Sequence, residues 1–137
     1  MARTALTALF LIGYATAGAV SAASPSDIQR SLEAEARQSA PGFTGFLAQR
    51  GEQFFNARHG GDWSCATCHT SDPRQPGRHA TTGKAIAPLA PAANPERFTN
   101  AARVEKWFGR NCNDVLRRTC TAAEKGDVLT WLLSLGK

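Results

Sequence analysis

The stretch Cys65-Ala66-Thr67-Cys68-His69 lies near the middle of a chain of 137 residues. The Cys-x-x-Cys-His spacing is typical of covalent haem attachment, because two thiols at this separation can add to the two vinyl groups of one porphyrin. The histidine that follows then turns its imidazole toward the iron. We therefore predict one haem c, attached through Cys65 and Cys68, with His69 as the proximal ligand of the iron.

Two other uses of a Cys-x-x-Cys pair are less favoured. The pair also occurs as a redox-active dithiol or as half of a zinc site. The sequence has four cysteines, and no second pair of ligands stands at zinc spacing. Cys112 and Cys120 lie far downstream of the motif and close enough to each other to form a bridge of their own.

The first 22 residues have the layout of an export signal. Arg3 supplies the positive end, an uncharged apolar run extends from Leu6 to Val20, and the residues up to Ala22 resemble a cleavage site. The run is short for a membrane anchor, which needs about 20 apolar residues. We expect cleavage near Ala22 or Ala23, a monohaem domain of residues 23–137, and a periplasmic location.

The charge of the chain is modestly positive. The formal net charge is +5, and loss of Arg3 with the signal reduces it to +4. A small basic protein suits an acidic redox partner. Nucleic-acid binding is not indicated, because the basic residues are scattered and form no platform with aromatic residues.

The spacing of apolar residues predicts an all-α fold without strands. The second of four expected helices, residues 43–57, carries an aromatic stripe from Phe43 to Phe55. The third is expected to end at Gly109. The last begins with a capping box at Thr121 and Glu124. A loop rich in proline and glycine is expected over 72–96, wrapped around the haem. The expected helices are 26–38, 43–57, 101–108 and 121–136.

The second axial ligand of the iron is less clear from the residues. Methionine is excluded, because the only methionine, Met1, leaves with the signal. His59 lies just before the motif and His79 lies in a polar loop after it, and both are interpreted as surface histidines. Tyr14 falls in the signal, and nothing in its context distinguishes Lys84. The residues alone therefore leave the sixth ligand open.

Three further segments carry a family resemblance. They are Arg50-Gly-Glu-Gln-Phe-Phe55, Thr82-Gly-Lys-Ala-Ile-Ala-Pro-Leu-Ala-Pro91 and Arg103-Val-Glu-Lys-Trp-Phe-Gly-Arg-Asn-Cys-Asn113. With the haem motif they make most of the mature chain similar to the sphaeroides haem protein family of oxygen-binding class I cytochromes c. The resemblance implies a class I cytochrome c fold of four or five short helices and long loops around one covalent haem.

The resemblance also assigns roles to residues downstream. It implies that Asn111 is the distal iron ligand, through its side-chain oxygen, and that Cys112 and Cys120 form a disulfide. From the residues alone, Asn111 is as readily a helix C-cap after Gly109, and Asn113 is an equally polar neighbour. The implied function is electron uptake from a partner, such as a dihaem cytochrome c, followed by binding of oxygen or nitric oxide when Asn111 is displaced from ferrous iron.

Two alternative functions remain. A plain electron carrier would need a stable sixth ligand such as His79. A haem enzyme acting on oxygen, peroxide or nitric oxide would need acid and base groups beside the iron, and no catalytic residue is assigned. Two structural details are also expected. Gly51, Phe55 and Trp131 match the positions where the first and last helices of class I cytochromes c cross, and the carbonyl of Pro88 is a candidate acceptor for the ring N–H of His69.

Overall fold

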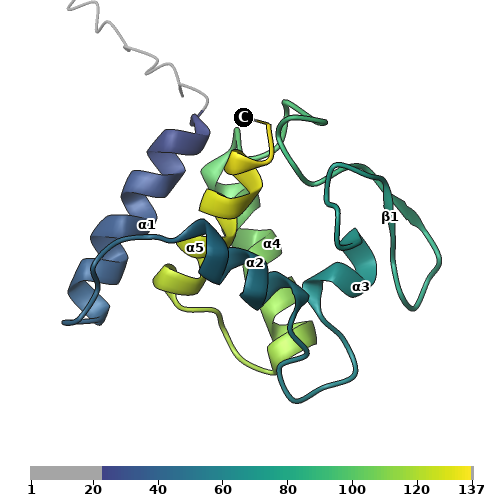
Figure 1. Cartoon of the computed structure of the whole chain (residues 1–137), viewed down its shortest axis with the longest axis horizontal. Coiled ribbons are helices and arrows are strands. Elements are labelled where there is room, and N and C mark those ends of the chain that lie inside the picture. The colour runs from purple at the N-terminus through teal and green to yellow at the C-terminus, as the bar shows by residue number, and fades with distance from the viewer. Residues whose placement is uncertain (1–22, 137) are drawn as a thin grey trace, which may run out of the picture.

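The computed structural model describes residues 23–136, so the predicted export signal lies outside the described residues. Over this range the chain is mostly helical, as predicted, with one pair of very short strands (Figure 1). Among these residues no helix is both long and apolar enough to cross a membrane. The elements are α1 (Pro25–Ser39), α2 (Ala48–Asn56), α3 (Cys65–His69), β1 (Gly77–Arg78), β2 (Ala85–Ile86), α4 (Ala101–Leu116) and α5 (Ala122–Ser134).

Helices α2 and α5 cross in close contact at Gly51. A Cβ atom at this position would lie 2.0 Å from the backbone oxygen of Asp127, so only glycine allows the two backbones to approach so closely. One turn further along α2, the ring of Phe55 lies 5.0 Å from the ring of Trp131. Both side chains are buried together with Val128 and Leu132 of α5. The crossing expected at Gly51, Phe55 and Trp131 is confirmed.

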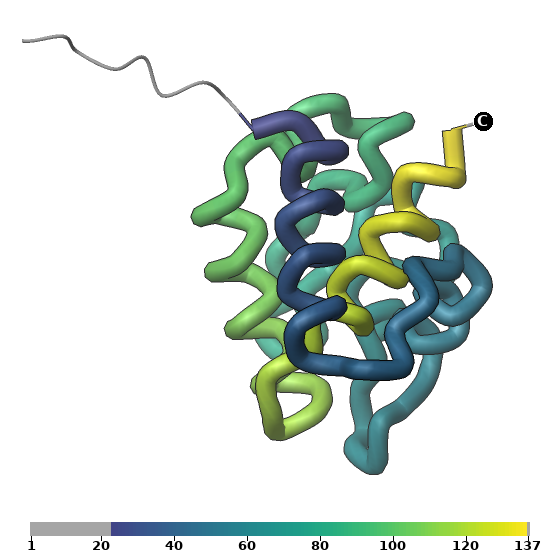
Figure 2. Tube along the Cα trace, turned by 90° about the vertical axis from the view of Figure 1, so that its left-hand side faces the viewer, coloured from purple at the N-terminus to yellow at the C-terminus, as the bar shows by residue number. Residues whose placement is uncertain are grey.

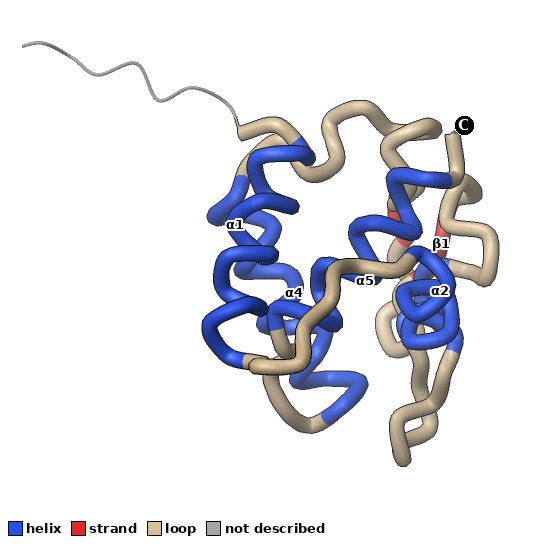
Figure 3. The backbone as a smooth tube through the Cα atoms, turned by 60° about the vertical axis from the view of Figure 1, so that its left-hand side comes forward, coloured by secondary structure: helices blue, strands red, loops and turns tan. Residues whose placement is uncertain are grey.

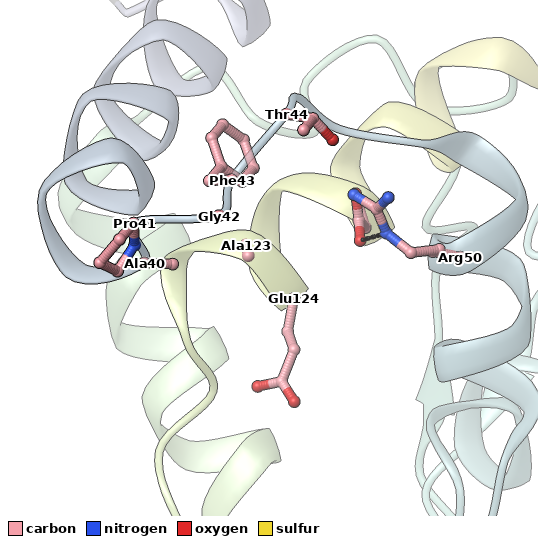
Figure 4. A pocket seen from close by; sticks show the side chains of 9 residues that line it. Ala40, Pro41, Gly42, Phe43, Thr44, Arg50, Ala123 and Glu124 are labelled. Carbon is pink, nitrogen blue, oxygen red and sulfur yellow. Dashed lines mark hydrogen bonds and ion pairs between the residues drawn. The ribbon is translucent and has the colours of Figure 1, made fainter.

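The carboxylate of Asp127 fixes the start of α2 against α5. Its oxygens accept hydrogen bonds from the backbone nitrogen of Leu47 at 2.7 Å and from Arg50 Nε and Nη2 at 2.7 and 2.9 Å. Figure 4 shows Arg50 beside a shallow surface pocket that the turn from Ala40 to Thr44 also lines. Because this ion pair occupies the guanidinium, the pocket offers no free charge to a ligand.

The start of the second helix differs from the prediction. Helix α2 begins at Ala48 rather than at residue 43, because Gly45 has a φ of +121°, which a helix does not accommodate. The aromatic stripe is therefore divided. Phe43 and Phe46 lie in the preceding loop, with ring centroids 5.1 Å apart, and pack against the cluster that α1 and α5 form.

The first and last helices agree with the predictions. Helix α1 packs its buried residues Ile28 and Leu32 against α5. At the start of α5, the backbone nitrogen of Thr121 donates to Glu124 Oε2 at 2.8 Å, and the backbone nitrogen of Glu124 donates to Thr121 Oγ1 at 3.2 Å. This is the predicted capping box, and Arg118 holds the same carboxylate.

Helix α4 is longer than predicted and is only lightly packed. It continues through Gly109 to Leu116 and ends where Arg117 adopts a φ of +60°. A Cβ at Gly109 would meet nothing within 4 Å, so the glycine sits at an open surface and does not break the helix. Of the residues of α4, only Cys112 is buried, and it forms a disulfide with Cys120 across a Cα separation of 5.6 Å.

The loop expected over 72–96 contains the strand pair, which the prediction of a strandless fold missed. Strands β1 and β2 are antiparallel, with Gly77 opposite Ile86. The pair lies on the opposite side of the fold from α1 (Figure 3). The remainder of the loop is held by the carbonyl of Pro73, which accepts the backbone nitrogens of Leu89 and Ala90, each at 2.9 Å. The loop is thus ordered by its own backbone hydrogen bonds.

Two glycine substitutions test the importance of the α2–α5 crossing. Gly51→Ala forces a methyl group against a backbone carbonyl, and we expect it to lower the free energy of unfolding by at least about 2 kcal/mol. Gly109→Ala places the same methyl group in open space within a helix, and we expect a gain of about 0.5–1 kcal/mol. Urea unfolding of the haem-loaded protein, followed by circular dichroism, measures both. Equal effects of the two variants would contradict the role of the crossing.

Candidate haem site

The motif Cys65–His69 forms its own short helix, α3. Residues at positions i, i+3 and i+4 lie on one helix face, so Cys65, Cys68 and His69 point to the same side. The helix starts where the backbone nitrogen of Ser64 donates to Thr67 Oγ1 at 2.9 Å. It ends at Thr70, whose φ of +61° is unusual for a β-branched residue, so the chain turns sharply after His69.

The β1–β2 hairpin lies directly against this helix. A Cβ at Gly77 would lie 2.0 Å from the backbone oxygen of Cys68, so a larger residue cannot replace this glycine without displacing α3. The backbone nitrogen of Ala80 donates to Cys68 Sγ at 3.3 Å. Sequence reasoning treated Gly77 only as a loop residue, because a contact between distant segments leaves no local signal.

Burial sets the protonation of the site. It raises the pKa of the Cys65 thiol to about 11. Burial, with a smaller contribution from the charge of Arg97, lowers the pKa of His69 to about 4. His69 is therefore neutral near pH 7, which is the form that binds a metal. Cys65 is un-ionised, whereas a redox-active dithiol requires a lowered thiol pKa.

The surroundings of the motif are apolar. The ring centroid of Phe55 lies 6.3 Å from that of His69, and Cys65 packs against the buried cluster that contains Phe55 and Trp131. Leu89 from the long loop and Phe108 from α4 pack on the same cluster. No group of three or more His, Cys, Asp or Glu side chains that could hold a metal ion forms among residues 23–136. Two unpaired thiols, a neutral imidazole and apolar walls fit a covalently attached haem.

Arg97 is a cation that the sequence analysis missed. It donates to the carbonyl oxygen of Ala87 at 2.7 Å and to that of Pro88 at 2.9 Å, and it has no ion-pair partner in the described part of the chain. Burial lowers its pKa. A half-buried guanidinium close to His69 suits the carboxylates of a haem. Arg97 lies in an irregular loop, so no spacing in the sequence could have identified it.

The hydrogen bond expected between His69 and Pro88 is absent among the described residues. The Pro88 carbonyl instead accepts Arg97 and, at 3.3 Å, Asn94 Nδ2. These two donors use both lone pairs of the oxygen, so the expectation was wrong.

The other candidates for the second axial ligand either form hydrogen bonds within the structure or lie in the β1–β2 hairpin, away from α4. His59 Nε2 is 2.8 Å from the carbonyl oxygen of Phe54, whose ring lies against the imidazole. His79 Nδ1 accepts the backbone nitrogens of Thr81 and Thr82 at 3.3 and 3.2 Å, within the β1–β2 hairpin. Lys84 is exposed in the same hairpin.

Asn111 lies inside α4, so its interpretation as a helix C-cap is wrong. Its side chain is exposed and takes part in none of the hydrogen bonds found within residues 23–136. Trp107 and Phe108 precede it by one helical turn and lie beside it on the helix surface. Phe108 packs on the cluster that Cys65 also contacts. The next residue, Cys112, anchors this turn of α4 through its disulfide.

Comparison with known proteins agrees with this geometry. Residues 41–132 match a family model described as a domain of unknown function, DUF1924. The chain is 44% identical over 131 residues to the cytochrome c-type protein SHP of Cereibacter sphaeroides, covering 93% of this chain and 98% of that protein. It is 41% identical over 88 residues to cytochrome c'' of Methylophilus methylotrophus, covering 61% of each.

Solved structures give the same result. The fold superposes on oxidized SHP, described as an oxygen binding cytochrome c, with a TM-score of 0.74, 44% identity, and coverage of 82% of this chain and 98% of the other. Oxidized cytochrome c'' from Methylophilus methylotrophus gives a TM-score of 0.72, 33% identity, and coverage of 80% and 93%. Haem c is therefore the cofactor, and the chain belongs both to the DUF1924 family and, as a relative of SHP, to the c-type cytochromes.

Proposed function

We propose that this protein is a His69/Asn111-ligated cytochrome that receives an electron from a partner cytochrome and then binds oxygen or nitric oxide where Asn111 is displaced. The position of Asn111 carries the proposal. Its amide is exposed and uncommitted, and it lies on a helix whose Phe108 packs on the same cluster as Cys65. The described part of the chain contains no methionine to compete for the iron.

The chemistry of an amide ligand supports easy displacement. A side-chain amide oxygen is a weak ligand with low affinity for ferrous iron. The relatives support this reading, because SHP is described as oxygen binding and a solution structure of cytochrome c'' is described as giving insights into haem-ligand detachment. A haem whose ligand can be displaced therefore agrees with what is described for both relatives.

Residues of this chain prepare the cofactor for that role. A bound haem would supply an iron that changes oxidation state and accepts a further ligand. His69 would bind that iron as a neutral imidazole, because burial depresses its pKa. Phe55 and Leu89 belong to the apolar surroundings against which Cys65 packs, and Arg97 would offer a charge for the haem carboxylates. Export to the periplasm and a dihaem cytochrome c as donor complete the proposal.

Optical spectra of the purified holoprotein test the proposed function. We expect reduction with dithionite to give five-coordinate, high-spin iron, because the amide leaves, and the spectrum then to shift on addition of carbon monoxide. A low-spin spectrum in both oxidation states that ignores carbon monoxide would instead show a strong sixth ligand and a plain electron carrier.

Substitution of the two neighbouring asparagines identifies the ligand. Asn111→Ala should retain covalent haem, open the sixth position in the ferric protein, and raise the affinity for imidazole on the order of tenfold, since about 1.4 kcal/mol of competition is removed. Asn113→Ala is the matched control, because this exposed residue is on a different side of α4. An unchanged ferric spectrum for Asn111→Ala, or a loss of low-spin character for His79→Ala, would refute the assignment.

Removal of the disulfide tests how the ligand is held. The Cys112→Ala/Cys120→Ala variant opens a closed loop with a sequence separation of 8, and we expect a loss of about 2.6 kcal/mol in unfolding free energy. Because the bond anchors the residue next to Asn111, the ferric spectrum should also show a larger high-spin fraction. Chemical unfolding and the spectrum at low temperature measure the two effects. Lost stability with an unchanged ferric spectrum would show that the bond only stabilises the fold.

A further inference from the structure

Three cations form a stripe along the outer face of α4. Arg103, Lys106 and Arg110 follow one another at intervals of three and four residues, so they lie on adjacent turns of one helix face. All three are exposed. Figure 2 shows α4 at one edge of the fold, with no other segment outside it. We call these three residues the basic stripe.

The like charges of the basic stripe repel one another. Like charges separated by three or four residues destabilise a helix by about 0.2–0.5 kcal/mol per pair. Arg103 also lies in the first turn of α4, where the helix dipole disfavours a cation. Asp114, one turn beyond Arg110, is the only acid that follows on this face, and Glu105 is directed to Lys125 of α5 at 2.9 Å. These repulsions act against the helix, and Arg110, at one end of the stripe, is the member whose neighbours Trp107 and Asp114 offset them.

The three cations are unpaired, as are five other cations in the described part of the chain. None of them forms an ion pair with a described residue, whereas the structure pairs Arg30, Arg37, Arg50, Arg74, Arg118 and Lys125 with acids. Their charges remain available to an external group.

Arg110 also contacts an aromatic side chain. Its guanidinium lies 5.3 Å from the centre of the Trp107 ring. Trp107 lies beside Asn111 and so belongs to the face proposed to meet the haem, and Arg110 lies next to that face. Arginine is one of the residue types that most often dominate the affinity of protein interfaces.

From these observations we infer that the basic stripe forms a docking surface for an acidic patch on the electron-donating protein. The inference rests on the proposed function, in which a partner supplies the electron. Complementary charge steers such a partner and speeds its association. Docking here brings the donor to the helix that carries Asn111. One aromatic residue is too small an apolar surface to insert stably into a lipid bilayer.

The test measures reduction of the ferric holoprotein by two donors. Flavodoxin semiquinone is an acidic protein donor, and lumiflavin semiquinone is a small neutral one, and flash photolysis generates both. The test variant is Arg103→Gln/Lys106→Gln/Arg110→Gln. The control variant is Arg58→Gln/Arg78→Gln/Lys84→Gln, which removes the same charge from exposed residues elsewhere, two of them on the β1–β2 hairpin.

We expect the test variant to react with flavodoxin on the order of tenfold more slowly than wild type at 10 mM ionic strength, where charges act over about 30 Å. The difference should shrink at 150 mM, where the range is about 8 Å. The control variant should stay within about twofold of wild type. Equal slowing of both variants, or greater slowing of the control, would overturn the inference, because net charge or the hairpin would then direct docking.

Two further measurements separate the possible failures. Lumiflavin should reduce all three proteins at the same rate, which shows that the haem is equally accessible in the variants. A ferrous protein that then ignores carbon monoxide contradicts the proposed function, and the flavodoxin rates still test docking independently. Binding of wild type to phosphatidylglycerol vesicles that the test variant loses would assign the stripe to a lipid surface and overturn the inference.

Discussion

The close crossing of α2 and α5 at Gly51 is the constraint on which the rest of the structure depends. Asp127 acts there twice, since its backbone oxygen occupies the space that a side chain at residue 51 would need and its carboxylate holds Arg50 and the start of α2. With the two helices fixed, Phe55 is placed between Trp131 and His69. The crossing therefore transmits its geometry to the haem motif through the buried cluster that contains Phe55 and Trp131.

Helix α4 is held by a different set of contacts. The disulfide between Cys112 and Cys120, the ion pair between Lys125 and Glu105, and the packing of Phe108 secure it, while most of its surface is open. The protein thus has a rigid pair of helices that positions the motif and a separately tethered helix that presents Asn111. This division suits the proposed function, in which His69 is a permanent ligand of the iron and Asn111 an exchangeable one.

The sequence predicts those features whose cause is local. The Cys-x-x-Cys-His spacing identified the motif, and the capping residues Thr121 and Glu124 located the last helix. The start of α2 was missed, because it depends on the backbone of Gly45 and on a carboxylate 80 residues away. The end of α4 was missed because a glycine inside a helix lowers its stability without always ending it, and α4 continues through Gly109. The site residues Arg97 and Gly77 act through contacts between distant segments, which no pattern in a single sequence records.

The exposure of Asn111 has a consequence for how such proteins evolve and can be engineered. Its side chain is exposed and forms no hydrogen bond within the described fold, so exchanging it costs the scaffold little. Under the proposed function, mutation at this one codon would change the coordination chemistry without a compensating change in the core. The scaffold would then be a ready host for designed ligand sets, because the proposed ligand is not a residue that selection must also keep for folding.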